Sequence, residues 1–516
     1  MARRRLRTTA ATFRRSGPGP RLCVGAVAFG AALSRPAGAY DATVDATFDA
    51  QLYQVTSPFG SPALSRHRYT ETLSLKVYDL QGDHDPKAPE LDAVARLRVD
   101  TDFGVSPEER DPTNERAFVP GLQTTPLDIM MAYVEGRNYV GGLLGFRLGR
   151  QYVVDALGWW SFDGGLARIT TPAHVAFETY GGFEQRGGLF MLSTSRFEGD
   201  GVSRGSRNGV PVDLDTSYLE ESRLAPAYGF AVESTGLTWL STRLTYRKVI
   251  DRDTVLVSPF ADSSGNFATT GGDRVSSERV GWAGTLTAAG LGSLRGDVVY
   301  DLYSQRTSEY AASLDGTPFP ALALGVDYEY FVPTLDGDSI WNWFSHFGTT
   351  TIQGRARVQP VHGLTFALTG GVRRFVTEGD PATYTATTAN ATGSTSADSS
   401  LYDVLGSLDA VYKFARGTGS LRLMDEQGDR GKRRGGDVAL RHFFDDGRYD
   451  ANGILSLYQW SDALRPDGDV ASFSYVVGGG YRPFPKTRVG IEWEHSMNVL
   501  VGQRFRALAT IDFTVL

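Results

Sequence analysis

Apolar and polar residues alternate without interruption along residues 41–52. Six apolar residues occupy one set of alternate positions, and six polar residues, three of them aspartates, occupy the other. Successive side chains of a β-strand point to opposite faces, so this period of two predicts a strand with one apolar and one polar face. The apolar set is Ala42, Val44, Ala46, Phe48, Ala50 and Leu52.

The same alternation recurs along the rest of the chain, in windows of about ten residues separated by turn residues. Short turns, such as 360–363 and 483–486, are interspersed with long polar connections at 104–126, 196–226, 251–277 and 378–400. Short turns on one side and long loops on the other are typical of a transmembrane β-barrel. Clear windows cover 91–102, 142–154, 175–184, 228–235, 239–249, 280–288, 294–305, 351–359, 364–376, 401–414, 420–427, 437–444, 453–460, 472–482, 487–497 and 505–515.

We therefore predict an all-β fold, a single transmembrane antiparallel β-barrel over residues 40–516. The windows number 21 in all, which is odd, whereas single-chain bacterial barrels have an even number of strands. Strand directions counted from the two ends of the chain conflict between Leu294 and Val332. We expect about 20 strands, with 18 and 22 as alternatives. The opening strand Asp41–Leu52 should pair with Phe505–Val515, because closure leaves no unpaired edge.

Residues 1–39 have the features of a cleaved export signal. An arginine-rich head precedes Leu22–Leu33, an apolar run of 12 residues that is too short to span a bilayer. Ala37-Gly38-Ala39 fits the cleavage site, so the mature chain should begin at Tyr40 and enter the barrel without a plug or soluble domain. We expect it in the outer membrane of a Gram-negative bacterium, with outer-membrane lipid and the barrel assembly machinery as partners.

Composition excludes several classes of protein. The one cysteine, Cys23, lies in the predicted signal, so the mature chain should have neither disulfides nor thiolate metal sites. The net charge is −7, and the signal carries eight arginines and no acid, so the mature chain is still more acidic. Such a chain lacks the basic face that nucleic-acid phosphates require. No apolar run reaches 18 residues, so no transmembrane helix is predicted.

No motif makes a convincing catalytic or metal site, and we expect neither enzymatic activity nor a cofactor. Gly201–Gly205 matches G-x-S-x-G but lies in a Gly/Arg/Ser loop without the strand and helix that pose a nucleophilic serine. The seven histidines are scattered, and neither His442 nor His495 has a serine partner. Asp336-Gly337-Asp338, and Asp213 with Asp215, lack the ligand spacing of a calcium loop and are typical of polar turns.

Candidate pore-lining residues lie on the polar faces of the predicted strands. On 351–359, the alternation turns four polar side chains inward, Gln353, Arg355, Arg357 and Gln359. The next strand adds Arg373 or Arg374 near its outer end. A row of arginines on a pore wall favours anionic solutes, but the same row could serve only in ion pairs that solvate the wall. The candidates are Gln353, Arg355, Arg357, Arg373 and Arg374, with the acids Asp297, Asp301, Glu492 and Glu494.

Two segments resemble known outer-membrane barrels. Gly149-Arg150-Gln151, followed by Phe162-Asp163-Gly164, resembles the G-R-Q and F-D-G motifs of alginate-export and related porin-like proteins. This resemblance implies a pore with an arginine-lined lumen that passes anions. Tyr328–Phe344 is similar to a segment of uncharacterised proteobacterial outer-membrane barrels. The last strand is similar to the C-terminal strand that assembly machinery reads, although it ends in Leu516 and not in an aromatic residue.

These observations predict a porin-like channel for passive diffusion of small or anionic hydrophilic solutes. We expect a loop folded into the lumen to set its size, with 196–226 and 251–277 as candidates. Two alternatives remain open: a structural or adhesive barrel plugged by its loops, and a hydrolase with a site at the rim. Neither the solute nor the oligomeric state follows from the sequence.

Overall fold

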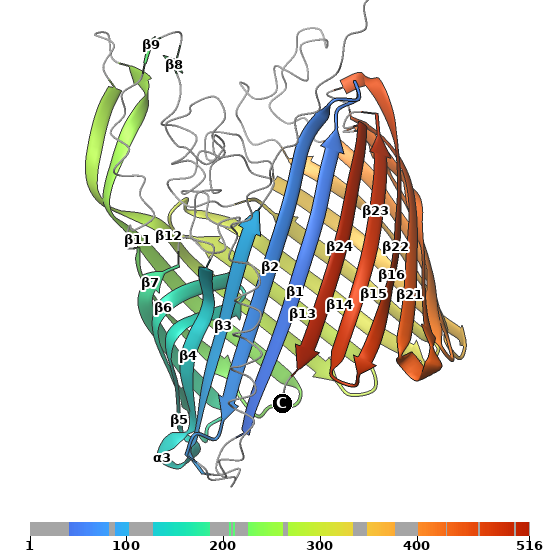
Figure 1. Cartoon of the computed structure of the whole chain (residues 1–516). Helices are drawn as coiled ribbons and strands as arrows, with labels where there is room; N and C mark the ends of the chain where they lie inside the picture. Colours follow the sequence, from blue (N-terminus) through green and yellow to red (C-terminus); the bar gives the residue numbers. More distant parts are fainter. Residues whose placement is uncertain are drawn as a thin grey trace, which may run out of the picture.

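The strands form one closed antiparallel sheet of 22 strands in a computed structural model of the chain (Figure 1). The structure describes residues 41–81, 88–102, 127–185, 206–207, 210–211, 225–261, 267–333, 348–376, 401–429, 431–462, 465–499 and 502–514. Each strand of the barrel pairs with the next one along the chain, and β1 pairs with β24 over Asp45–Thr56 and Gln503–Thr514. Closure therefore satisfies the backbone of both edge strands, as the alternation of Asp41–Leu52 and Phe505–Val515 predicted.

The barrel strands run from 9 to 22 residues. The first group is β1 (Asp41–Thr56), β2 (Pro62–Tyr78), β3 (Glu90–Asp102), β4 (Leu127–Asn138), β5 (Leu144–Asp155), β6 (Gly158–Thr170), β7 (Val175–Glu184), β10 (Pro226–Ser234), β11 (Leu240–Ala261), β12 (Phe267–Ala288) and β13 (Gly292–Asp301). The second is β14 (Arg306–Phe319), β15 (Leu322–Phe331), β16 (Gly348–Val361), β17 (Leu364–Val376), β18 (Leu401–Phe414), β19 (Gly417–Gly428), β20 (Gly431–Phe444), β21 (Tyr449–Asp462), β22 (Arg465–Phe484), β23 (Thr487–Asn498) and β24 (Gly502–Thr514). Outside the barrel sheet lie β8 (Ser206–Arg207), β9 (Val210–Pro211), the one-turn helix α3 (Tyr139–Gly142) and the 3₁₀ turn η4 (Asp445–Gly447).

The fold class is confirmed, and the strand number is the higher of the two alternatives. The conflict in strand direction between Leu294 and Val332 is resolved by two strands, β14 and β15, that follow β13 there. The β14–β15 turn, at Pro320 and Ala321, is only two residues long. A two-residue turn contains few polar residues, so the alternation alone did not reveal the boundary between β14 and β15.

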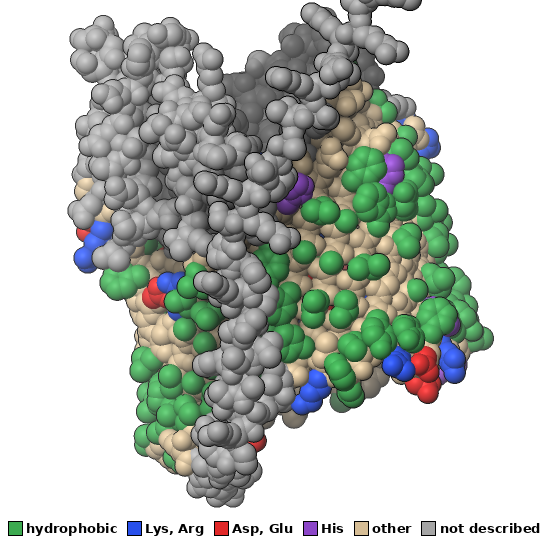
Figure 2. All heavy atoms as spheres, in the orientation of Figure 1, with side chains coloured by type: hydrophobic (Ala, Val, Ile, Leu, Met, Phe, Trp, Pro, Cys, Tyr) green, Lys and Arg blue, Asp and Glu red, His purple; other side chains and the backbone are tan. Residues whose placement is uncertain are grey.

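The outer face of the barrel is apolar. Large hydrophobic side chains at alternate positions are exposed there, among them Leu148, Leu314, Leu368 and Leu457 at 57–60%. Hydrophobic side chains are spread over the wall in Figure 2, whereas acidic and basic ones are few and lie at its lower edge, its left side and its upper right edge. A closed sheet with an apolar exterior spans a lipid bilayer, because every backbone group is paired and hydrocarbon covers the outward side chains.

No helix in the described part of the chain is long and apolar enough to cross a membrane.

The ends of the barrel chain lie on one rim. β1 starts and β24 ends at the lower rim of Figure 1, where β4 connects to β5 through α3 and β20 connects to β21 through η4. These lower connections are short, as the sequence predicted. The predicted signal, the motif at Gly201–Gly205 and the loops at 104–126 and 378–400 lie outside the described residues.

The stretch 251–277 is not a long polar loop. β11 and β12 pair through it, with Thr254 opposite Gly272 and Val257 opposite Thr269, and rise above the other strands in Figure 1. Threonine, valine and glycine here continue the ladder despite three register shifts. The prediction that this segment folds into the lumen was therefore wrong. The other candidate, 196–226, is described only at β8, β9 and its last two residues, Ala225 and Pro226.

The apolar exterior leads to a matched test of the membrane-facing wall. Leu455 in β21 is 48% exposed on the outer face, and its neighbour Ser456 faces the lumen opposite Ser474. We expect Leu455→Arg to lower the free energy of unfolding in lipid vesicles by about 2–4 kcal/mol, because it places a charge in hydrocarbon. Ser456→Arg should change it far less, because its guanidinium reaches water. Denaturant titration of refolding in vesicles measures both values, and equal losses would contradict this assignment of faces.

Candidate functional site

The strand register places most of the predicted pore-lining residues on the inner face. In β16, Gln353, Arg355 and Arg357 alternate with Ile352, which is 53% exposed on the outer face. Asp297 and Asp301 in β13 take the face opposite Val298 and Tyr300, which are exposed outward. Glu492 and Glu494 likewise face inward on β23, opposite Ile491 and Trp493.

Arg373 and Arg374 fall on opposite faces of β17. Arg373 pairs with Thr351 and Asp403 on the inner side, and its guanidinium lies 3.0 Å from the Glu426 carboxylate. Arg374 shares the outer row with Val372, near the end of the strand, and is exposed. The expectation that Arg374 lines the pore is therefore corrected, because strand parity admits only one of two consecutive residues.

Arg355 does not present a free charge to the lumen. Its guanidinium contacts Asp327 at 2.5 Å and Asp315 at 2.9 Å, on the two preceding strands. Gln353 donates a hydrogen bond to the same Asp327 at 3.4 Å. The wall here carries more negative than positive charge.

The predicted acids also belong to ion pairs, with one exception. Glu492 and Glu494 contact Arg506 at 3.0 and 2.8 Å, and Glu494 also contacts Arg504. Asp301 is 3% exposed, lies 3.6 Å from Arg279, and accepts backbone hydrogen bonds from the turn that follows β13. Asp297 forms no ion pair with a described residue.

Both signs of unpaired charge nevertheless remain on the inner face. Within the described ranges, four arginines form no ion pair and are exposed on inward rows. Three carboxylates on neighbouring strands, around Ala311, likewise lack a basic partner in this part of the chain. A recess of about 700 Å³ opens beside them on the lumen wall. The arginines are Arg96, Arg295, Arg357 and Arg433, and the acids are Asp297, Glu309 and Glu329.

The upper half of the β5–β6 hairpin leaves the barrel wall. β4 pairs with β5 only from Gly136 to Ala132, where Ala132 lies opposite Arg150. β6 pairs with β7 only as far as Phe162, opposite Glu184. β5 and β6 continue to pair with each other as far as Asp155 and Gly158. Residues 151–161, called here the inward hairpin, thus form a two-stranded ribbon apart from the wall ladders.

Glycines make the bend at the base of the inward hairpin possible. Gly149 has a φ of +125°, and a Cβ there would lie 2.2 Å from the Ala132 carbonyl oxygen. A Cβ on Gly164 would lie 2.7 Å from the Cα of Gly182, and the reverse distance is also 2.7 Å. Only glycine permits this close approach of β6 and β7.

The G-R-Q and F-D-G motifs are paired face to face at this bend. Gly149, Arg150 and Gln151 lie opposite Gly164, Asp163 and Phe162. The Arg150 guanidinium holds both Asp163 oxygens, at 2.7 and 2.8 Å, and donates to the Ile129 carbonyl on β4 at 2.8 Å. The bond to Ile129 satisfies a carbonyl on β4 that no longer has β5 as its neighbour, because β4 and β5 pair only over Ala132–Gly136.

The inward hairpin packs on the inner face of β7, β10 and β11. Trp160 and Phe162 stack at 4.5 Å and both contact Tyr180. With Val153 they form a cluster in which each side chain is at most 7% exposed. The cluster packs against small residues on the inner face of the wall. Burying such side chains contributes about 1.5–3 kcal/mol each, so removal of apolar surface from the water-filled lumen drives docking. The wall residues of the cluster are Tyr180, Ala225, Ala227 and Val249.

The tip of the hairpin reaches β12. A Cβ on Gly281 would lie 2.7 Å from Leu157 Cδ2 and 3.1 Å from Ala156 Cβ. Gly281 lies on the inner face of β12, because the next residue, Trp282, is 42% exposed on the outer face. The tip of the hairpin therefore lies inside the lumen. Arg247 of β11 donates to the Leu157 carbonyl at 2.9 Å and lies over the Trp160 ring at 5.3 Å.

The opposite face of the hairpin is open. The rings of Tyr152 and Trp159 lie 6.2 Å apart and are 38% and 43% exposed, and Val154, opposite Trp159, is 66% exposed. Arg147, stacked on Tyr133 of β4, donates to the Tyr152 carbonyl at 3.3 Å. The hairpin therefore presents an aromatic surface next to the inner face of β4.

Sequence reasoning missed the inward hairpin as the element that narrows the lumen. The signal was present, because the two glycine-containing motifs flank an insert, Asp155–Ser161, with two adjacent tryptophans. In a barrel strand, one of two adjacent tryptophans must face inward, and here it is Trp160. What the sequence could not supply was the partner surface, since Ala227, Val249 and Gly281 lie far along the chain.

The two histidines considered as catalytic candidates face away from the lumen. His442 stacks on Phe414 and meets Phe444 edge-on, and His495 stacks on Phe505 at 4.4 Å, both on outward rows. No group of three His, Asp or Glu side chains is placed to hold a metal ion in the described part of the chain. Asp213, Asp215 and Asp336–Asp338 lie outside the described residues.

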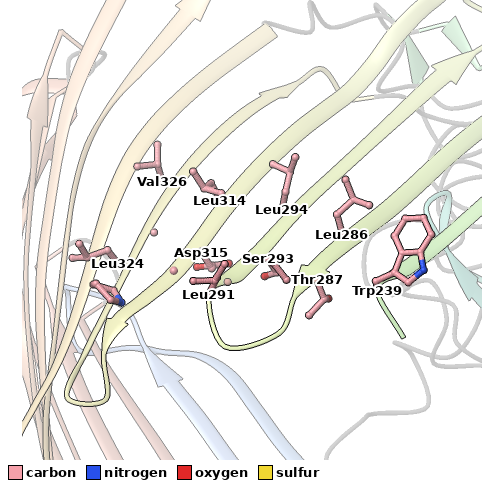
Figure 3. A pocket seen from close by; sticks show the side chains of 15 residues that line it. Trp239, Leu286, Thr287, Leu291, Ser293, Leu294, Leu314, Asp315, Leu324 and Val326 are labelled. Atoms are coloured by element: carbon pink, nitrogen blue, oxygen red, sulfur yellow. The ribbon is translucent and has the colours of Figure 1, made fainter. Parts of the chain in front are cut away.

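A pocket of about 540 Å³ lies on the membrane-facing side, near the β12–β13 turn. Figure 3 shows Trp239, Leu286, Leu291 and Leu294 among the side chains that line it. Leu286 and Leu294 belong to outward rows, so hydrocarbon has direct access to this pocket.

Comparisons with known proteins add only distant resemblance. Neither a protein-family model nor a curated protein sequence matches the chain. Among solved structures, the outer membrane protein OpdK of Pseudomonas aeruginosa is 12% identical, with a TM-score of 0.39 over 92% of this chain and 98% of that one. OccAB1 of Acinetobacter baumannii is 11% identical, with a TM-score of 0.40 over 92% and 96%. Likeness at this level carries no argument about function, and the resemblance to alginate-export barrels rests on the paired motifs alone.

The glycine contact at the bend gives a matched pair of substitutions on β7. A Cβ on Gly182 would lie 2.1 Å from the Asp163 carbonyl, whereas on adjacent Gly181 its nearest neighbour is 3.7 Å away. We expect Gly182→Ala to cost about 1–3 kcal/mol through overpacking. Gly181→Ala should change the free energy of unfolding by less than about 1 kcal/mol. Denaturant unfolding of both variants tests this, and a tolerated Gly182→Ala would contradict the bend.

Proposed function

We propose that this chain is a porin-like channel of the outer membrane that lets small hydrophilic solutes diffuse through a water-filled lumen. The observation that carries the proposal is a closed barrel of 22 strands whose inner face stays polar and partly exposed, although a hairpin lies within it. Barrels of 16 strands or more enclose space that wall side chains alone do not fill. No catalytic step belongs to this proposal.

The inward hairpin sets the size of the passage. It covers the inner faces of β7, β10, β11 and the Gly281 region of β12. Arg422, on the inner face of β19, has a side chain that is 60% exposed. The solute therefore passes between the aromatic face of the hairpin and the charged wall.

Solutes in this passage meet charges of both signs. Anions, the class that the sequence favours, find unpaired guanidinium groups at Arg96, Arg295, Arg357 and Arg433. Asp297, Glu309 and Glu329 offer the opposite sign on neighbouring strands. The arrangement supports passage of small anions and of other hydrophilic solutes, with a preference decided by the position of the unpaired arginines.

Conductance separates this proposal from a plugged barrel. Protein refolded into a planar bilayer should give stable open levels. Absence of conductance from a barrel whose intact fold is shown by heat-modifiable migration would favour a structural or adhesive role. The proposal includes delivery through an export signal at residues 1–39, insertion by the barrel assembly machinery and a lipid environment.

Substitution of single arginines tests the source of selectivity. Arg357→Gln should lower anion preference slightly, because it removes an unpaired charge. Arg355→Gln should shift the channel further toward cations, because it leaves Asp315 and Asp327 without a partner. Arg374→Gln, on the outer face, is the control and should leave selectivity unchanged. Reversal potentials in a salt gradient measure the three effects, and identical values for all three would contradict these roles.

A further inference from the structure

Among the described residues, one polar side chain of the wall hydrogen-bonds the tip of the inward hairpin. Arg247 is 6% exposed, and its Nη2 donates to the Leu157 carbonyl at 2.9 Å. The same guanidinium covers the Trp160 ring, so one side chain contacts both the turn and the strand after it. Trp160 Nε1 also donates to the Glu184 carboxylate of β7 at 2.9 Å. The other contacts of the tip, with Gly281, are van der Waals contacts.

Docking leaves several buried polar atoms without hydrogen bonds from the protein. Nη1 of Arg247, Oη of Tyr180, Oδ2 of Asp155 and Oε1 of Gln151 are all buried and have no partner among the described residues. All four lie on the hairpin or on the wall beneath it. Unpaired buried polar groups oppose burial, so this interface is less favourable than its apolar area suggests.

The base of the hairpin, in contrast, is firmly held. Arg150 binds Asp163 and the edge of β4, and the side chain of Gln151 donates to the Gly164 carbonyl at 3.0 Å. A secure base with a weakly held tip allows the ribbon to move as a unit about its glycines. Undocking would give water access to the four unpaired atoms and widen the lumen.

We infer that Arg247 is the positioning residue that latches the inward hairpin against the wall and keeps the channel in its narrow state. Its loss lets the tip leave Gly281 and the passage widen. This inference rests on the proposed function, since it concerns the size of the same lumen.

The first experiment compares Arg247→Met with Lys248→Met. Methionine keeps an apolar stem against Trp160 but removes the bond to Leu157. Lys248, the next residue, faces outward and pairs with Glu278 at 3.0 Å, so its substitution removes a basic residue without touching the hairpin. We expect single-channel conductance to rise roughly two-fold in Arg247→Met, because the narrowest section limits flow, and to stay at the wild-type level in Lys248→Met. Unchanged conductance in a folded Arg247→Met barrel overturns the inference.

A reversible cross-link separates latching from general damage to the barrel. The mature chain predicted here has no cysteine, and Ala156 Cβ lies 3.1 Å from the Cβ position of Gly281. A disulfide joins Cβ atoms about 3.5–4.5 Å apart, so Ala156→Cys with Gly281→Cys can form one after a small shift. Oxidation should return Arg247→Met carrying both cysteines to the narrow conductance, and reduction should widen it again. Failure of oxidation to narrow a cross-linked channel overturns the inference.

Labelling decides the same point without conductance. Leu157 is 8% exposed, so a cysteine there should react slowly with a bulky maleimide in an otherwise wild-type barrel. Adding Arg247→Met should speed labelling about tenfold or more, since loss of a charge-assisted hydrogen bond promotes local opening. Equal rates overturn the latch. A silent channel with accelerated labelling would instead reject the proposed function and keep the latch.

Discussion

Every other feature of this protein depends on the requirement that no backbone amide or carbonyl be left unpaired in hydrocarbon. The ladder between β1 and β24 meets that requirement for the two strands that would otherwise be edges. Once the sheet is closed, the period-two alternation has a fixed meaning, with one face toward lipid and the other toward the lumen. The apolar exterior, the polar interior and the space inside all follow from closure.

In the described part of the chain, the wall departs from this rule where the inward hairpin enters the lumen. Above Ala132 and Phe162, β5 and β6 leave their neighbours, and the chain replaces the lost ladder with other contacts. Arg150 satisfies a carbonyl on the edge of β4, and the close contact of Gly164 and Gly182 allows the bend. Apolar side chains that would face water in an open lumen are buried against small residues of β10 and β11. The bend thus narrows the channel while leaving few backbone amide and carbonyl groups unpaired.

Local alternation predicted what depends on one strand, and it failed where two distant strands decide. It gave the opening strand, its closing partner and the inward position of Arg355, because parity is a property of a few consecutive residues. It could not show that Asp315 and Asp327 neutralise Arg355, since ion pairs depend on register across strands. It placed neither β14 nor the inward hairpin, because a two-residue turn and a docking surface near Ala227 and Gly281 leave no local pattern. The paired G-R-Q and F-D-G motifs were visible, but their facing geometry was not.

The strand order also has a kinetic meaning. Every ladder of the barrel but one joins strands that follow each other along the chain, and only β1–β24 joins residues separated by most of its length. Neighbouring hairpins form from local contacts, whereas the final joint has to close a very long loop. The entropy of such closure grows only as the logarithm of loop length, so a barrel of this size is not much harder to close than a smaller one. Assembly is therefore a series of short-range steps followed by a single long-range one, and the sequence of the first and last strands bears on that last step alone.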